Sequence, residues 1–277
     1  MSINDDIKNQ WKRVKSKGKK DLIKWIMEYW LIAIIIVILI ICFVAFLIYT
    51  PFHTKSNVFG VTFINASVSE DESEEMEEDF MNYASIDSNK SKISIDLNEI
   101  LSIGETNSTM DIYTLQSLSV RITAKEIDVL LADAYVFDAY AKRGQFLDLR
   151  EILDEDDLNY FDDKIYYIDM AQVESLNTDD EKKEESDTQG ETELSTDNFE
   201  NFSGIDEETY SSISPDVYVL PDPSSMEDPI PVGIVCNDAS YIKNHHNYDD
   251  IVCLFGIFLD SEHLEASKLF LNYLYEE

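Results

Sequence analysis

Basic side chains are scarce in this sequence, and their scarcity excludes a large class of partners. The 277 residues include 21 Lys and Arg against 56 Asp and Glu, a net charge of −35. Contacts to a nucleic-acid backbone need clusters of Lys and Arg, and so does docking on an anionic lipid surface. We therefore expect no nucleic-acid partner. Such a negative charge is typical of an exposed domain that the charge keeps soluble. The alternative is that acidic residues form a surface that binds cations.

Cysteine and histidine are also few, with three and four copies. Cys236 and Cys253 lie in apolar runs without a C-x-x-C partner, so a zinc site is not expected. They are either two buried free thiols, the plainer interpretation, or a disulfide between paired strands. The adjacent His245 and His246 are typical of a polar loop. No G-x-S-x-G, P-loop or H-E-x-x-H motif occurs, and we expect no enzyme, cofactor or metal.

The exception to this charged composition is an apolar run near the N-terminus. Residues 31–48 read LIAIIIVILIICFVAFLI, and the stretch without charge extends over 29–54. A helix needs about 20 such residues to cross a hydrocarbon layer of about 30 Å, and aromatic residues at both ends suit the headgroup zone. We predict a transmembrane helix at 29–50 that contacts the lipid bilayer, followed by a stalk at 51–56.

The charges on the two sides of this run predict its direction. Residues 1–50 carry eight basic and four acidic side chains, and residues 51–277 carry 13 and 52. Basic residues close to a membrane helix stay cytoplasmic. The expected protein is single-pass, with a basic cytoplasmic segment at 1–28 and the C-terminal domain outside the cell. A cleaved signal peptide is the alternative, but its apolar core is shorter and an A-x-A site should follow it.

The remaining chain alternates between strand and helix patterns. This alternation predicts a three-layer α/β domain over 57–277 with a largely parallel or mixed sheet. The expected strands are 57–65, 92–97, 128–133, 164–173, 251–260 and two runs within 216–238, and the expected helices are 69–84, 110–127, 134–143 and 261–277.

An acidic segment interrupts this pattern. Residues 174–209 contain few apolar side chains and many Asp, Glu, Ser and Thr. Such a composition buries too little surface to offset its chain entropy, so we expect a disordered loop. Calcium binding is the alternative, but the D-x-D-x-D-G spacing of calcium loops is absent.

Three segments resemble one protein family. EIDVLLADAYVFDAYAKRGQFLDL (126–149), DPIPVGIVCND (228–238) and IVCLFGIFLDSEHLEASKLFLNYL (251–274) are similar to units of extracellular solute-binding proteins with the type 2 periplasmic-binding fold. The single anchor helix before FGVTFINA (59–66) is similar to uncharacterised membrane-anchored bacterial proteins. The family has two lobes, whereas 154–215 contains one strand pattern and the acidic segment. The resemblance therefore implies one lobe that recognises a ligand or a protein.

Candidate ligand-binding residues follow two of the predicted strands. Open α/β sheets bind ligands beyond the carboxyl ends of their strands. This rule selects Asp133 and Tyr135 after DVLLAD, and Asn237 and Asp238 after PVGIVC. Asp133 could instead cap the helix that follows it. The partner is then a small-molecule ligand or, for the alternative function of a structural or assembly subunit, another membrane protein.

Overall fold

The computed structural model describes residues 11–13, 20, 35–46, 55–67, 72–101, 109–173 and 213–276. It divides into two compact units, Met1–Lys55 and Ser56–Glu277, each of which is described by itself. The predicted disordered loop at 174–209 lies outside the described residues, as do most of the segment 1–28 and most of the stalk.

In the first unit, residues 35–46 are helical and consist of apolar side chains. Ten of the large ones are between 46% and 63% exposed. No helix within the described residues is both long and apolar enough to span a membrane. The two ends of the predicted transmembrane helix, 29–34 and 47–50, lie outside the described residues.

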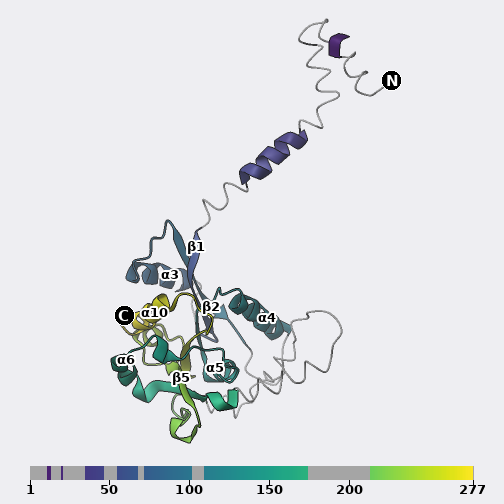
Figure 1. The fold of residues 1–277 in the computed structure, drawn as a ribbon. Helices are drawn as coiled ribbons and strands as arrows, with labels where there is room; N and C mark the ends of the chain where they lie inside the picture. Colours follow the sequence, from purple (N-terminus) through teal and green to yellow (C-terminus); the bar gives the residue numbers. More distant parts are fainter. Residues whose placement is uncertain are drawn as a thin grey trace, which may run out of the picture. The chain divides into compact units, whose positions relative to one another are not determined.

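The second unit is built on a six-stranded mixed sheet (Figure 1). The strand order is β2-β1-β3-β6-β5-β4. Strand β1 pairs in parallel with β2 and β3, and all later pairings are antiparallel. The strands are β1 Ser56–Ile64, β2 Ser91–Glu99, β3 Val129–Asp133, β4 Ile165–Asp169, β5 Pro229–Val235 and β6 Cys253–Ile257.

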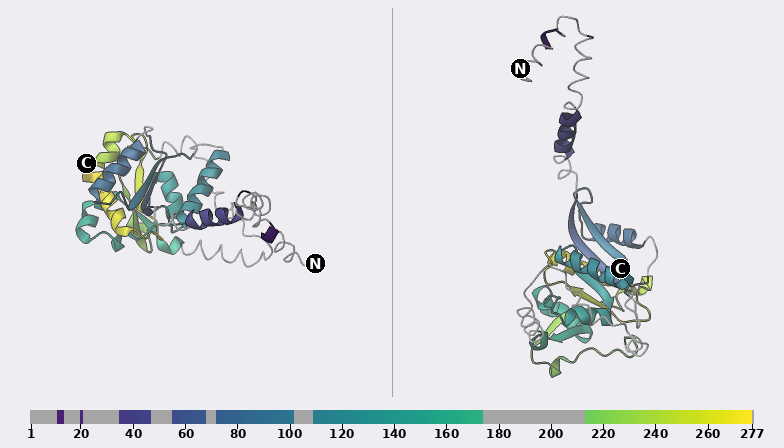
Figure 2. Two further views of the ribbon diagram at one scale, coloured as in Figure 1. Left: turned by 90° about the horizontal axis from the view of Figure 1, so that it is seen from above. Right: turned by 90° about the vertical axis from the view of Figure 1, so that its right-hand side faces the viewer.

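Helices α3 (Glu72–Tyr83) and α10 (Leu264–Glu276) cover one face of the sheet (Figure 2). Their fully buried Phe80 and Phe270 pack against Phe59 of β1, with ring centroids 5.3 and 5.6 Å away. Rings in tilted contact of this kind add to the stabilisation that burial of their area provides. This aromatic cluster is the centre of the core on that side.

Helices α4 (Thr109–Thr123) and α5 (Ala134–Ala141) cover the opposite face. Phe137 of α5 lies directly on the sheet, where a Cβ atom at Gly233 or Gly256 would come within 2.5 or 2.7 Å of its ring. Both positions therefore need glycine so that the ring can approach the backbone. With helices on both faces, the domain is a three-layer α/β sandwich as predicted.

The predicted elements differ from the observed ones in three places. The strand expected over 164–173 ends at Asp169, and residues 170–173 are helical. Only the second run of 216–238 forms a strand, β5, because the first run lies outside the sheet, with Val219 82% exposed. In α4, Leu115 and Leu118 are buried but Ile112, expected on the same stripe, is 43% exposed. The short elements are η1 Leu149–Glu151, α6 Glu155–Tyr160, η2 Asp162–Lys164, η4 Pro223–Ser225 and α9 Ser240–His245.

Candidate functional site

The carboxyl ends of β1 and β3 lie side by side, at the edge of the sheet that is formed by strand ends and not by an outer strand. The chain leaves β1 for β2 on one side, whereas β3 lies on the other side of β1. This divergence is a topological switch point, the place where open α/β sheets hold ligands. The residues that follow the two strands, Asn65 and Asp133, are therefore the first to consider.

Asn65 and Asp133 bind one another across this switch point. Asn65 Nδ2 donates to Asp133 Oδ2 over 2.8 Å, and Asn65 Oδ1 accepts from Leu101 N over 2.8 Å. Asn65 has a φ of 60°, in the left-handed region that asparagine tolerates better than most residues. The sequence analysis did not select Asn65, although an asparagine directly after a buried strand is a signal for such a contact.

Asp133 caps α5, which is the alternative that the sequence left open. Its Oδ1 accepts from Tyr135 N and Val136 N over 3.0 and 3.1 Å. The side chain is fully buried, and burial raises its pKa although the hydrogen bonds from Val136 N and Asn65 oppose the shift. Both oxygens already accept hydrogen bonds from within the domain. Asp133 therefore stabilises the turn between β3 and α5 and does not offer a free acceptor to a ligand.

Asn237 has a similar structural role after β5. Its Nδ2 donates to the carbonyl oxygens of Tyr248 and Ile251, and its Oδ1 accepts from Cys253 N over 2.8 Å. Cys253 also pairs with Asp133 in the β3–β6 ladder. The structure therefore brings Asp133 and Asn237 to the two sides of β6.

The other two predicted residues keep exposed surface. Asp238 is 56% exposed in its side chain and pairs with Lys164 Nζ at 2.5 Å. Tyr275 Oη of α10 donates to the other oxygen of Asp238 over 3.3 Å. Tyr135, on the first turn of α5, is partly buried, and its burial and the nearby Asp133 raise its pKa.

Two further residues, absent from the sequence-based selection, complete the edge. Tyr248 Oη donates to the carbonyl oxygens of Ile64, the last residue of β1, and of Leu131, in the middle of β3. Asn247 Nδ2 donates to the buried carboxylate of Glu72 over 2.8 Å. Both lie in a stretch that the sequence analysis treated as a polar loop, and no local pattern distinguishes them.

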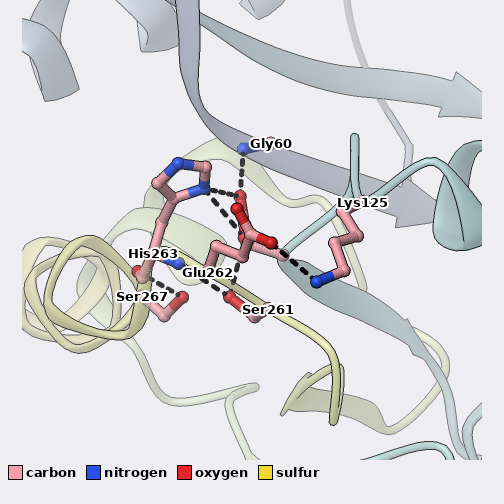
Figure 3. A network of polar contacts seen from close by, with 7 residues as sticks. Gly60, Lys125, Ser261, Glu262, His263 and Ser267 are labelled. Carbon is pink, nitrogen blue, oxygen red and sulfur yellow. Dashed lines mark hydrogen bonds and ion pairs between the residues drawn. The ribbon is translucent and has the colours of Figure 1, made fainter.

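A second polar cluster lies at the opposite edge of the sheet, around the start of α10 (Figure 3). Asp128, just before β3, is 1% exposed and accepts from Gly60 N, Ser261 Oγ and His263 Nδ1 over 2.9, 2.7 and 3.1 Å. Ser261 Oγ donates to the aspartate instead of to the imidazole, so this arrangement does not activate a serine nucleophile. The exposed pair of Lys125 and Glu262 flanks it at 2.6 Å.

Metal and thiol chemistry can be judged from the same geometry. No group of three or more His, Cys, Asp or Glu side chains within the described residues could hold a metal ion. Cys236, directly after β5, and Cys253, the first residue of the adjacent β6, are free, buried thiols. Burial raises the pKa of Cys236 to about 12, so its thiolate is disfavoured.

Comparisons with known proteins returned no relative. No family model, no curated protein and no solved structure matches the chain. Its function therefore has to follow from its own residues.

Proposed function

We propose that this chain is a single-pass membrane protein whose acidic α/β domain recognises a ligand or a protein on the outer side of the cell membrane, without catalysis. The observation that carries the proposal is the helix at 35–46. Its exposed apolar residues are consecutive, so they point in every direction around the helix axis. Such a surface is stable in lipid, whereas in water each Å² of it costs roughly 25 cal/mol.

The charge distribution supports the orientation. The basic side chains before the apolar run and the large acidic excess after it favour a cytoplasmic N-terminus.

The order of the strands supports a relation to one lobe of a solute-binding protein. In β2-β1-β3, helices link parallel strands, and the switch point between β1 and β3 is where such sheets hold ligands. In the segment that carries the resemblance, β3 is followed by α5, which Asp133 caps, and then by Gly144 with a φ of +66°. This order of strand, helix and glycine agrees with the resemblance. Tyr135 and Asp238 are the predicted ligand-contacting residues in this proposal.

Membrane extraction and protease accessibility test the anchor. We expect the full chain to stay in the membrane pellet at alkaline pH, and external protease to digest the α/β domain on intact cells. Ile38→Lys with Ile41→Lys places two charges in the apolar helix and should release the chain. Quantitative release of the unchanged chain, or a mature chain that lacks the apolar run, would refute a permanent anchor.

Ligand recognition can be tested on the full chain in mild detergent. Sugars, peptides and metal salts are screened for an upward shift of the melting temperature, and Tyr135→Ala or Asp238→Ala should abolish any shift. Glu262→Ala, at the opposite edge, is the matched control. The absence of a shift with every class would contradict ligand recognition.

A second candidate function is an assembly subunit, and the outer side of α4 favours it. Tyr113 and Val120 are 63% and 54% exposed, seven residues apart on one side of the helix, next to the uncharged Gln116 and Ser117. Such a side suits contact with another membrane protein. Tyr113→Lys with Val120→Lys should then release a partner seen in native gels of solubilised membranes, whereas unpartnered migration of the unaltered chain would exclude this function.

A further inference from the structure

We infer that Glu77 prevents strand pairing at the outer edge of the sheet, formed by β2. Its side chain accepts a hydrogen bond from a backbone N–H group of β2, and this group would otherwise pair with β2 of a second copy of this chain. This inference concerns self-association and is independent of the proposed function.

Strand β2 is the sheet's outermost strand on this side and pairs only with β1 within the described residues. Its nine residues, SKISIDLNE, contain no proline, and burial alternates along the strand from Ile93 to Leu97. Backbone groups of alternate residues therefore point outward, away from β1. A long edge of this kind is a template for a strand of another chain unless the protein blocks it.

Glu77 blocks the middle of this edge. Its Oε1 accepts from Ile95 N over 2.8 Å, so the side chain reaches from α3 around the rim of the sheet. Burial raises the pKa of Glu77, and the hydrogen bond from Ile95 opposes that shift. An incoming strand would have to displace the carboxylate from Ile95 and bury it further, which is unfavourable for a charged group.

The end of the same strand is blocked differently. Asn98 N donates to Asp96 Oδ1 over 3.1 Å, and the ladder with β1 is irregular between Thr62 and Ile64. Bulges and local side-chain bonds of this type are recognised ways of making an edge unsuitable for pairing. Glu77 therefore protects the regular stretch that these features leave open.

The residue pattern of β2 suits pairing with itself once Glu77 is removed. In an antiparallel pair of two β2 strands with Ser94 opposite itself, Lys92 of one copy lies opposite Asp96 of the other. Two favourable cross-strand charge pairs then form around the centre. A second copy is thus the occupant that the edge accepts.

Hydrogen exchange and cysteine trapping in the full chain test the inference. At a dilution at which the chain stays monomeric, Glu77→Ala should raise the exchange rate of the Ile95 amide at least about tenfold, because a bond to a charged group is lost and no second strand replaces it. Glu77→Asp withdraws the oxygen by one methylene while keeping the charge, and should raise it as well. Glu77→Gln retains an acceptor oxygen and should leave it nearly unchanged, as should Glu78→Ala, an exposed neighbour that removes the same charge.

In a Cys42→Ser background, Ser94→Cys traps antiparallel β2 pairs as disulfide-linked dimers under mild oxidation. The dimer yield should rise several-fold with Glu77→Ala and Glu77→Asp, but not with Glu78→Ala or Glu77→Gln. Circular dichroism confirms that each variant is folded. An unchanged Ile95 exchange rate in both Glu77→Ala and Glu77→Asp would overturn the inference, and so would equal trapping in Glu78→Ala.

Discussion

The two ends of strand β3 carry buried aspartates that have different partners. Asp133, at the carboxyl end, accepts from two backbone N–H groups of the helix that follows it and from Asn65. Asp128, before the amino end, accepts from one backbone N–H and from the side chains of Ser261 and His263.

The difference lies in what each carboxylate holds together. Asp133 mainly caps α5, the helix that follows it directly in the chain, so most of its contacts are local. Asp128 joins β3 to β1 and to the start of α10, where its partners Gly60 and His263 lie 68 and 135 residues away from it in the chain. A local cap is replaceable by another acceptor, whereas a carboxylate with three donors from two distant segments has no simple substitute. We therefore expect substitution of Asp128 to lower the free energy of unfolding more than substitution of Asp133.

The largest effect is expected for Asp128→Ala. It leaves Gly60 N, Ser261 Oγ and His263 Nδ1 without their buried acceptor, which should lower the free energy of unfolding by about 3 kcal/mol or more. Urea unfolding of the full chain in detergent, followed by far-UV circular dichroism, measures it. Asp260→Ala, an exposed neighbour, should be near neutral, and similar losses in both variants would contradict the role of Asp128.

A smaller loss is expected for Asp133→Asn, of about 1–2 kcal/mol, because its amide N–H₂ would face the amide N–H₂ of Asn65. The exchanged pair Asn65→Asp with Asp133→Asn restores a donor and an acceptor across the switch point. It should recover at least half of the loss in the same urea experiment. No recovery would mean that the contact between the two side chains is not the stabilising element.

The pH dependence separates Asp133 from an exposed carboxylate. Because its pKa in the folded protein is raised above the unfolded value, Asp133 contributes stability at acidic pH that is lost as the pH rises through the folded pKa. Asp169 has its pKa lowered by backbone N–H groups of Asp228 and Glu227, so its contribution is lost as the pH falls. The stability difference between wild type and Asp133→Asn should therefore favour wild type more at pH 4 than at pH 7, and the difference for Asp169→Asn should change in the opposite direction.

The smallest effect is expected for Ser261→Ala, of about 1 kcal/mol. Asp128 keeps Gly60 N and His263 Nδ1 as donors in this variant. The losses are the bond from Ser261 Oγ to Asp128 and the longer bond that Ser261 Oγ accepts from His263 N over 3.2 Å. A loss as large as that of Asp128→Ala would show that Ser261, rather than the aspartate, organises the cluster.

Much of the fold was predictable from local patterns. The alternation in 57–65 and 92–97, the apolar run DVLLAD and the periodicity of α10 each predict the element that the structure contains. The capping role of Asp133 was also foreseen, because a short acid before a helix has a local function. The first of the two strands expected within 216–238 was wrong, since an extended apolar pattern does not show whether a partner strand is available.

The candidate site was less predictable. Position at a strand end selected Asp133 and Asn237 as candidates for ligand binding. It did not show that the oxygens of Asp133 and the side-chain amide of Asn237 already have hydrogen-bond partners within the protein. Asn65, Tyr248 and Asp128 were missed because their partners lie 68 to 184 residues away in the chain. The spacing of neighbouring residues in the sequence does not indicate contacts over such separations.

The sequence by itself determined the apolar helix, the charge contrast around it and the alternation of strands and helices, because these depend on composition and on periods of a few residues. Only the tertiary structure decided that β6 enters antiparallel between β3 and β5. It also decided which donors surround each end of β3 and that Glu77 lies over the edge of β2. These features arise when distant segments bury a common surface and their polar groups must find partners there, which no single segment specifies.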